Sequence, residues 1–323
     1  MRYLLFFVLM GFYSIASYSQ EFQFNTKEIS FNSGDITLYA DVYTPNNQKE
    51  EKIGIALILG SGNSDRSNVW SFLLAEFLAE NGYYVLLPDK RGCGKSEGDW
   101  KRTTFYELAN DASISAAHLK KLIGLEKIGI MGLSQGGKIA PMAAAKSDID
   151  FVINIVGSAR PVTEGIIHEV TNTAKEKGLK PDEIKEMLEL HVLLEEYIFS
   201  EERDWTQLGK KFEEAKNKTW SEFAATFPNS PDSWVWDFAK TNYVIDAMDY
   251  WRVLKQDVFF AFGTDDHNVL TYENVYSLQK GFREVKKTNY ELHVYPTGHS
   301  LYQSGTTFHA DFRRDLLYWL DKR

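Results

Sequence analysis

Residues 127–137 read Lys-Ile-Gly-Ile-Met-Gly-Leu-Ser-Gln-Gly-Gly, an apolar run followed by a serine between glycines. The run over 127–131 is short and apolar, as in a buried parallel strand, and a helical pattern begins at Gln135. A sharp strand-to-helix turn would hold the hydroxyl of Ser134 clear of the backbone. Glycines two positions before and after the serine relieve the crowding in such a turn. The stretch therefore predicts a nucleophilic serine, Ser134, at the end of a central strand.

Similar apolar runs alternate with helix-period segments along most of the chain. This alternation predicts right-handed βαβ units, with a mostly parallel sheet covered by helices on both faces. Two runs at the front, 28–31 and 36–43, flank a turn signal and predict an antiparallel hairpin. The expected fold is therefore α/β, with an eight-stranded, mostly parallel sheet. The other expected strands are 53–59, 83–87, 127–131, 151–156, 258–262 and 291–295, and the expected helices are 69–80, 104–123, 135–146, 272–283 and 310–320.

One interval interrupts the alternation. Between residues 156 and 258, about a hundred residues contain no convincing strand. A structureless loop of that length is improbable in a compact domain, and helical patterns occur over 181–196 and 204–227. We expect a helical cap insertion over 157–245, with the core formed by 20–156 and 246–323.

The first residues have the composition of an export signal. Arg2 precedes an apolar stretch over 3–15, and small residues follow at Ala16, Ser17 and Ser19. The stretch is shorter than the ~18–20 residues that cross a bilayer, which favours a cleaved signal peptide over a transmembrane anchor. The expectation is a signal peptide over 1–19 and a periplasmic or extracellular protein.

Composition narrows the classes of partner. Hydrophobic residues form 44% of the chain and charged residues 25%, as in soluble globular proteins, and the net charge is −9. An acidic surface repels phosphate backbones and anionic lipid headgroups, so neither nucleic acid nor a membrane surface is an expected partner. No second apolar run of spanning length follows the first, so stable membrane insertion is not expected either. The single cysteine, Cys93, excludes an internal disulfide. Oligomeric state does not follow from the sequence.

No cofactor or metal ion is expected. The chain lacks H-E-x-x-H, paired cysteines and carboxylates at calcium spacing. The glycine-rich segment 92–98 does not have the spacing of a phosphate-binding P-loop.

A nucleophilic serine needs a general base, because its hydroxyl is weakly reactive at neutral pH. Among the seven histidines, His299 lies in a Pro- and Gly-containing loop directly after the last expected strand. Loops at the carboxyl edge of an open α/β sheet are where such folds bind ligands, so His299 is the candidate base.

A third group should orient the imidazole, and fixed N–H groups should bind the oxyanion. Asp265 and Asp266 stand side by side after the strand over 258–262, and spacing does not separate them. For the oxyanion, the N–H of Gln135 is one candidate donor. A second should come from the glycine-containing loop over 60–66.

These motifs, in the chain order Ser, Asp, His, resemble the α/β-hydrolase superfamily, in particular exported bacterial serine esterases. Residues 89–96 are similar to the superfamily's D-x-R-G-x-G-x-S turn. Residues 60–66, Gly-Ser-Gly followed by Asp-Arg, are similar to its oxyanion loop, with Leu59 where relatives often have His. The resemblance covers 28–156 and 246–323 and leaves out the insertion.

The resemblance implies the remaining assignments. Acid loops of the superfamily commonly read G-x-x-D-x-x-V, which 263–269 matches with Asp266 rather than Asp265 in the acidic position. The same matching implies Ser61 as the N–H donor opposite Gln135. The implied activity is hydrolysis of small carboxylic esters by Ser134, Asp266 and His299 through an acyl-enzyme. A peptidase or amidase acting on small peptides, and a non-catalytic ligand-binding homologue, remain the alternatives.

Overall fold

The computed structural model describes residues 23–323, so the expected signal peptide over 1–19 lies outside the described residues. Across 23–323, no helix combines the length and the apolar character needed to cross a membrane.

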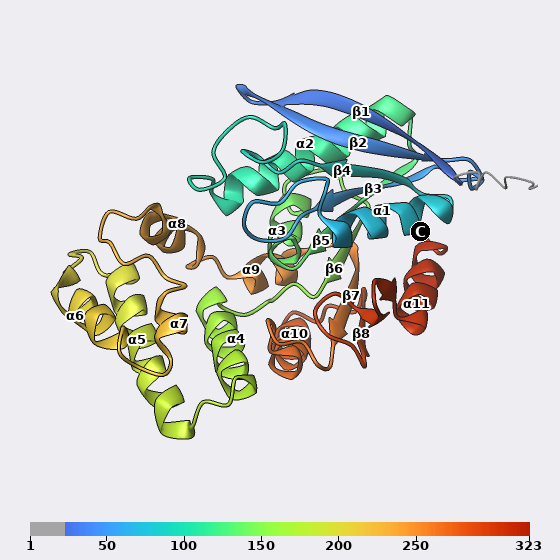
Figure 1. Ribbon diagram of the computed structural model, residues 1–323. Coiled ribbons are helices and arrows are strands. Elements are labelled where there is room, and N and C mark those ends of the chain that lie inside the picture. Colours follow the sequence, from blue (N-terminus) through green and yellow to red (C-terminus); the bar gives the residue numbers. More distant parts are fainter. Residues whose placement is uncertain (1–22) are drawn as a thin grey trace, which may run out of the picture.

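An eight-stranded sheet forms the centre of the molecule, in the order β1-β2-β4-β3-β5-β6-β7-β8 (Figure 1). The first hairpin is antiparallel and pairs antiparallel with β4, and all pairs from β4 to β8 are parallel. The expected α/β fold with a mostly parallel sheet is therefore confirmed. The strands are β1 (Phe24–Ser33), β2 (Ile36–Pro45), β3 (Ile53–Ile58), β4 (Tyr84–Pro88), β5 (Lys127–Leu133), β6 (Phe151–Ile155), β7 (Asp257–Gly263) and β8 (Tyr290–Tyr295).

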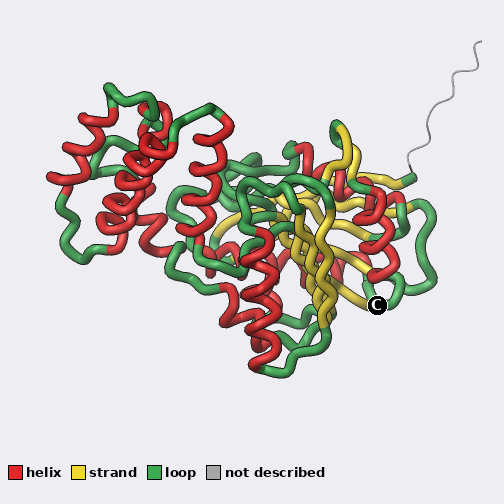
Figure 2. The backbone as a smooth tube through the Cα atoms, turned by 90° about the horizontal axis from the view of Figure 1, so that it is seen from below, coloured by secondary structure: helices red, strands yellow, loops and turns green. Residues whose placement is uncertain are grey.

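Helices cover both faces of the sheet, because its central strands are apolar on both sides (Figure 2). Successive side chains of a strand point to opposite faces, so β3 sends Ile55 and Leu57 into one core and Ala56 and Ile58 into the other. The first core packs against α1 (Val69–Glu80) and α11 (Ala310–Leu320). The second core packs against α2 (Phe105–Ile123), α3 (Gln135–Ala144), α9 (Ala247–Val253) and α10 (Thr271–Glu284).

The interval between β6 and β7 contains five helices before α9, and four of them, α5 to α8, stand at one end of the molecule beyond the sheet (Figure 1). They enclose a hydrophobic cluster of their own that includes the buried Trp220 and Trp236. We refer to α4 through α8 as the cap. The cap helices are α4 (Val162–Glu176), α5 (Pro181–Phe199), α6 (Trp205–Ala215), α7 (Ser221–Ala224) and α8 (Trp234–Asn242).

Three details differ from what the sequence patterns predicted. The single helix expected over 204–227 is divided into α6 and α7 by turns at 216–220. Helix α4 was not expected, although its apolar residues Val162, Ile166, Val170 and Ala174 recur at helical spacing. A short hairpin of β9 (Tyr302–Ser304) and β10 (Thr307–Phe308) also follows β8.

Candidate active site

Ser134 lies on the turn between β5 and α3, with a backbone φ of 52°. Residues other than glycine rarely adopt this left-handed region, so the surrounding structure must hold the turn in place. The Ser134 N–H donates to the carbonyl oxygen of Ile155 at 2.9 Å. A Cβ atom at Gly132 would lie 2.2 Å from the Gly136 oxygen, and one at Gly136 would lie 2.1 Å from the Ile58 oxygen. Both glycines are therefore required by close backbone approach.

Hydrogen bonds join Ser134, His299 and Asp266. His299 Nε2 lies 2.9 Å from Ser134 Oγ. Its Nδ1 lies 2.8 and 3.0 Å from the two carboxylate oxygens of Asp266. With the carboxylate ionised, Nδ1–H donates to Asp266, and Nε2 is left free to accept the hydroxyl proton of Ser134. The structure thus brings together three residues that lie far apart in the sequence, in the geometry that general-base activation of a hydroxyl requires.

Backbone hydrogen bonds connect the acid loop to the histidine loop. The Thr264 N–H donates to the Tyr295 oxygen at 2.8 Å, and the Asp265 N–H donates to the Thr297 oxygen at 3.0 Å. The two loops leave adjacent parallel strands, β7 and β8, at their carboxyl ends. Their relative position is therefore determined by the sheet, which places the acid beside the imidazole.

Asp266 faces His299, whereas the side chain of Asp265 is exposed. The Asp266 side chain is fully buried, at 0% exposure. Its Oδ1 also accepts from the N–H groups of Asn268 at 2.8 Å and Val269 at 3.0 Å. These donors satisfy a carboxylate that has no access to water.

Ser61 and Gln135, the expected oxyanion donors, line the same cavity as Ser134. Gln135 is the first residue of α3, so its N–H has no partner within the helix and lies at the positive end of the helix dipole. The loop that contains Ser61 is held by Lys90, whose ammonium donates to the Gly60 oxygen at 3.0 Å and also to the Gly62 oxygen. Burial lowers the pKa of Lys90 to about 8. The sequence patterns did not single out Lys90.

Hydrogen bonds connect residues 60–66, which are similar to an oxyanion loop, to residues 89–96, which are similar to the D-x-R-G-x-G-x-S turn. The backbone N–H and the Nε of Arg66 both donate to Asp89 Oδ1 at 3.0 Å. The Lys95 N–H donates to the other carboxylate oxygen at 2.9 Å. A Cβ atom at Gly94 would lie 2.5 Å from Asp89 Cγ, which explains the glycine there. The two motifs together position the loop beside Ser134.

The cavity at Ser134 has a volume of about 210 Å³. Lys138, a residue of the core, lines this cavity; it is 3% exposed and was not among the expected site residues. Its only sequence signal was a lysine one helical turn after the candidate nucleophile, inside an otherwise apolar helix. Cap residues form another wall of the cavity: Val162, Gly165, Ile166 and Glu169 of α4, and Tyr243 after α8.

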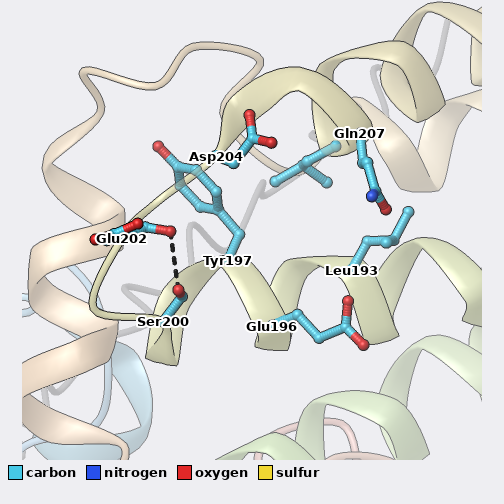
Figure 3. Close-up of a pocket in the computed structure, with 8 residues that line it drawn as sticks. Leu193, Glu196, Tyr197, Ser200, Glu202, Asp204 and Gln207 are labelled. Atoms are coloured by element: carbon cyan, nitrogen blue, oxygen red, sulfur yellow. Dashed lines mark hydrogen bonds between the residues drawn. The ribbon is translucent and has the colours of Figure 1, made fainter.

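A second cavity, of about 170 Å³, lies within the cap (Figure 3). It is lined by residues of α5, of α6 and of the segment between them, and Ser200 Oγ donates to the Glu202 oxygen at its edge. Histidine, lysine and cysteine are absent from its lining. Over residues 23–323, no group of three or more His, Cys, Asp or Glu side chains is arranged to hold a metal ion.

The sequence model of the alpha/beta hydrolase fold family matches residues 55–306. The chain belongs to this family, as its motifs had led us to expect.

Solved structures with a similar fold include an esterase from Pyrococcus furiosus, 17% identical, with a TM-score of 0.62 over 97% of this chain and 94% of that chain. Est1E from Butyrivibrio proteoclasticus, solved with ferulic acid bound, is 19% identical, with a TM-score of 0.58 over 91% and 98%. Proline iminopeptidase from Mycobacterium smegmatis is 14% identical, with a TM-score of 0.59 over 92% and 98%. At these identities the likeness shows the fold alone.

A curated relative, an acyl transferase from Photobacterium leiognathi, is 27% identical over 152 residues. The match spans 47% of this chain and 44% of that protein, less than half of each.

Proposed function

We propose that this protein is a serine hydrolase that cleaves carboxylic esters of small molecules through an acyl-enzyme intermediate. The observation that supports this function best is the continuous set of hydrogen bonds from Asp266 through His299 to Ser134. A protein that only binds a ligand has no need of a hydroxyl, an imidazole and a buried carboxylate in that order.

The proposed reaction has two halves. Ser134 Oγ attacks the acyl carbonyl carbon while His299 Nε2 takes its proton, and the oxyanion accepts from the N–H groups of Ser61 and Gln135. The C–O bond to the leaving alcohol then breaks, and His299 returns the proton to that alcohol. Water, deprotonated by the same imidazole, then attacks the carbonyl carbon of the acyl-enzyme. The bond from that carbon to Ser134 Oγ breaks, His299 returns the proton to Oγ, and the carboxylic acid is released.

The comparisons support this proposal at a coarser level. The family consists of α/β-hydrolases, and one solved structure of similar fold is named an esterase. The partial relative is named an acyl transferase, and acyl transfer uses the same acyl-enzyme chemistry with an acceptor other than water. A proline iminopeptidase of similar fold keeps amide hydrolysis as the second candidate.

Labelling with a fluorophosphonate tests the nucleophile directly. We expect wild-type protein to react and Ser134→Ala not to react, with kcat on p-nitrophenyl butyrate falling by a factor of about 10⁴ or more. Ser113→Ala is the matched control, because Ser113 lies outside the cavity and its hydroxyl donates only to helix carbonyl oxygens, those of Ala109 on α2 and Ala143 on α3. Absence of labelling in the wild type would support the binding-protein alternative instead. Hydrolysis of aminoacyl p-nitroanilides faster than of esters would favour the peptidase.

Export is a separate part of the proposal, supported by the composition of residues 1–19. Amino-terminal sequencing of protein recovered from the periplasm or medium should give Gln20 as the first residue. Recovery of an uncleaved chain in the membrane fraction would support an anchor.

A further inference from the structure

Lys138 is a buried cation in the cavity that contains Ser134. It lies on α3 one helical turn after Ser134, and 3% of its surface is exposed. Residues four apart share a helix face, and helical side chains tilt toward the amino-terminal end. The lysine side chain is therefore directed toward the end of α3 where Ser134 lies.

The ammonium of Lys138 has more donors than partners. An ammonium carries three N–H groups, and in the described residues only the Arg160 oxygen accepts from this one, at 2.9 Å. Glu164 and Asp246 are the carboxylates near enough to favour its charged form. Glu164 is instead bonded to Arg160 Nε at 2.6 Å, and Asp246 accepts from the Met248 N–H at 2.8 Å. Neither makes an ion pair with Lys138.

Two other lysines of similar pKa show the contrast. Burial lowers the pKa of Lys90, Lys138 and Lys287 to about 8 in each case. Lys90 donates to two carbonyl oxygens, and Lys287 to two carbonyl oxygens and a side-chain amide oxygen. Lys138 has a single acceptor and faces a cavity. A buried charge without a partner is costly, so a ligand that supplies one is bound favourably.

The position of the cavity indicates which half of an ester enters it. His299 returns its proton to the leaving alcohol, so that alcohol departs on the histidine side. The cavity is lined by both oxyanion candidates, Ser61 and Gln135, but not by His299. It therefore accepts the acyl half.

From this arrangement we propose that Lys138 binds a carboxylate on the acyl part of the substrate, which makes half-esters of short dicarboxylic acids the preferred substrates. This inference rests on the proposed ester hydrolysis and specifies its substrate class. A short acyl chain is required, because the four-residue step from Ser134 to Lys138 corresponds to only about 6 Å along the helix axis. Glu169, also in the cavity wall, is exposed, so water screens its repulsion of a carboxylate.

Two esters with five-carbon acyl groups test the proposal: mono-p-nitrophenyl glutarate and p-nitrophenyl pentanoate. We expect kcat/KM for the glutarate to exceed that for the pentanoate by about tenfold or more, as for a charge-assisted hydrogen bond. Lys138→Met should remove this preference, and Lys138→Arg should retain part of it. Lys240→Met is the matched control, because Lys240 also donates to one carbonyl oxygen, that of Ser200 at 2.8 Å, but lies outside the cavity. For Lys240→Met, the glutarate-to-pentanoate ratio of kcat/KM should equal that of the wild type.

The glutarate-to-pentanoate ratio distinguishes binding of a carboxylate by Lys138 from a purely structural role of Lys138 at the base of the cap. If Lys138 only anchors Arg160 at the entrance to the cap, Lys138→Met lowers both rates in parallel and the ratio stays constant, which overturns the proposal. A preference for a carboxylate on the leaving group, measured with the butyrate ester of 3-hydroxybenzoate, would overturn the assignment to the acyl half.

Glutarate binding separates failure of this proposal from failure of ester hydrolysis. Calorimetry should show that glutarate binds Ser134→Ala and does not bind Ser134→Ala/Lys138→Met. An active esterase without this binding overturns the lysine site alone. Lysine-dependent binding in a protein that hydrolyses no ester and resists the fluorophosphonate supports the site and overturns hydrolysis.

Discussion

Replacing Asp266 by Asn would reverse the hydrogen-bonding direction at the imidazole. Oδ1 of Asp266 accepts from the backbone N–H groups of Asn268 and Val269, so the amide oxygen of an asparagine would remain there. Its NH₂ would then occupy the position of Oδ2, 2.8 Å from His299 Nδ1. Because an NH₂ group only donates, Nδ1 must accept and the ring proton moves to Nε2. Nε2 can then no longer accept the proton of Ser134.

The expected loss of activity is large and the expected loss of stability is small. This tautomer reversal costs about 10⁴ in kcat in a Ser-His-Asp hydrolase, or about 5 kcal/mol of transition-state stabilisation. Both backbone hydrogen bonds to the side chain persist, and its volume is nearly unchanged. Asp266→Asn should therefore fold with a thermal midpoint close to that of the wild type.

Steady-state hydrolysis of p-nitrophenyl butyrate, with thermal unfolding measured in parallel, provides the assay. Asp265→Asn is the control, since it makes the same chemical change at the neighbouring, exposed position and should alter kcat less than about threefold. If Asp266→Asn retained kcat within tenfold of the wild type, or if Asp265→Asn were the more damaging change, the assignment of the acid would be wrong.

Three further changes test neighbouring parts of the site. Lys90→Met removes the ammonium that donates to the two carbonyl oxygens flanking Ser61, so kcat should fall about 10- to 100-fold while the protein stays folded. An unchanged kcat would show that the loop keeps its conformation without Lys90. Gly132→Ala would place a Cβ 2.2 Å from a backbone oxygen across the turn, and denaturant unfolding should show a loss of about 3 kcal/mol or more. A fully stable variant would mean that the turn can relax. The glutarate-to-pentanoate ratio of kcat/KM should fall as pH rises through about 8, because Lys138 is charged below that pKa and neutral above it. Titration of the imidazole affects both esters and cancels in this ratio, so a ratio that is constant from pH 6.5 to 9.5 would argue against a charged lysine as the recognition group.

Much of the fold, and part of the candidate site, could be predicted from local sequence patterns. Alternation of apolar runs and helical segments was sufficient to predict the eight-stranded sheet, because burial on one or two faces imposes a period on the chain itself. The glycines around Ser134 indicated a strand-to-helix turn, because close backbone approach in such a turn excludes a Cβ atom. The loop position of His299 followed from its proline and glycine neighbours. Their catalytic roles stay predictions until activity is measured.

Other features depend on contacts between distant residues, which no local pattern records. Spacing could not choose between Asp265 and Asp266, and only the packing of the acid loop against the histidine loop shows which carboxylate faces the imidazole. Helix α4 is different, because Val162, Ile166, Val170 and Ala174 do recur at helical spacing, so this helix could have been predicted from the sequence. Lys90 and Lys138 read as ordinary lysines along the chain. Their importance arises in the folded protein, because folding withdraws their charges from water and determines which oxygen atoms remain to accept from them.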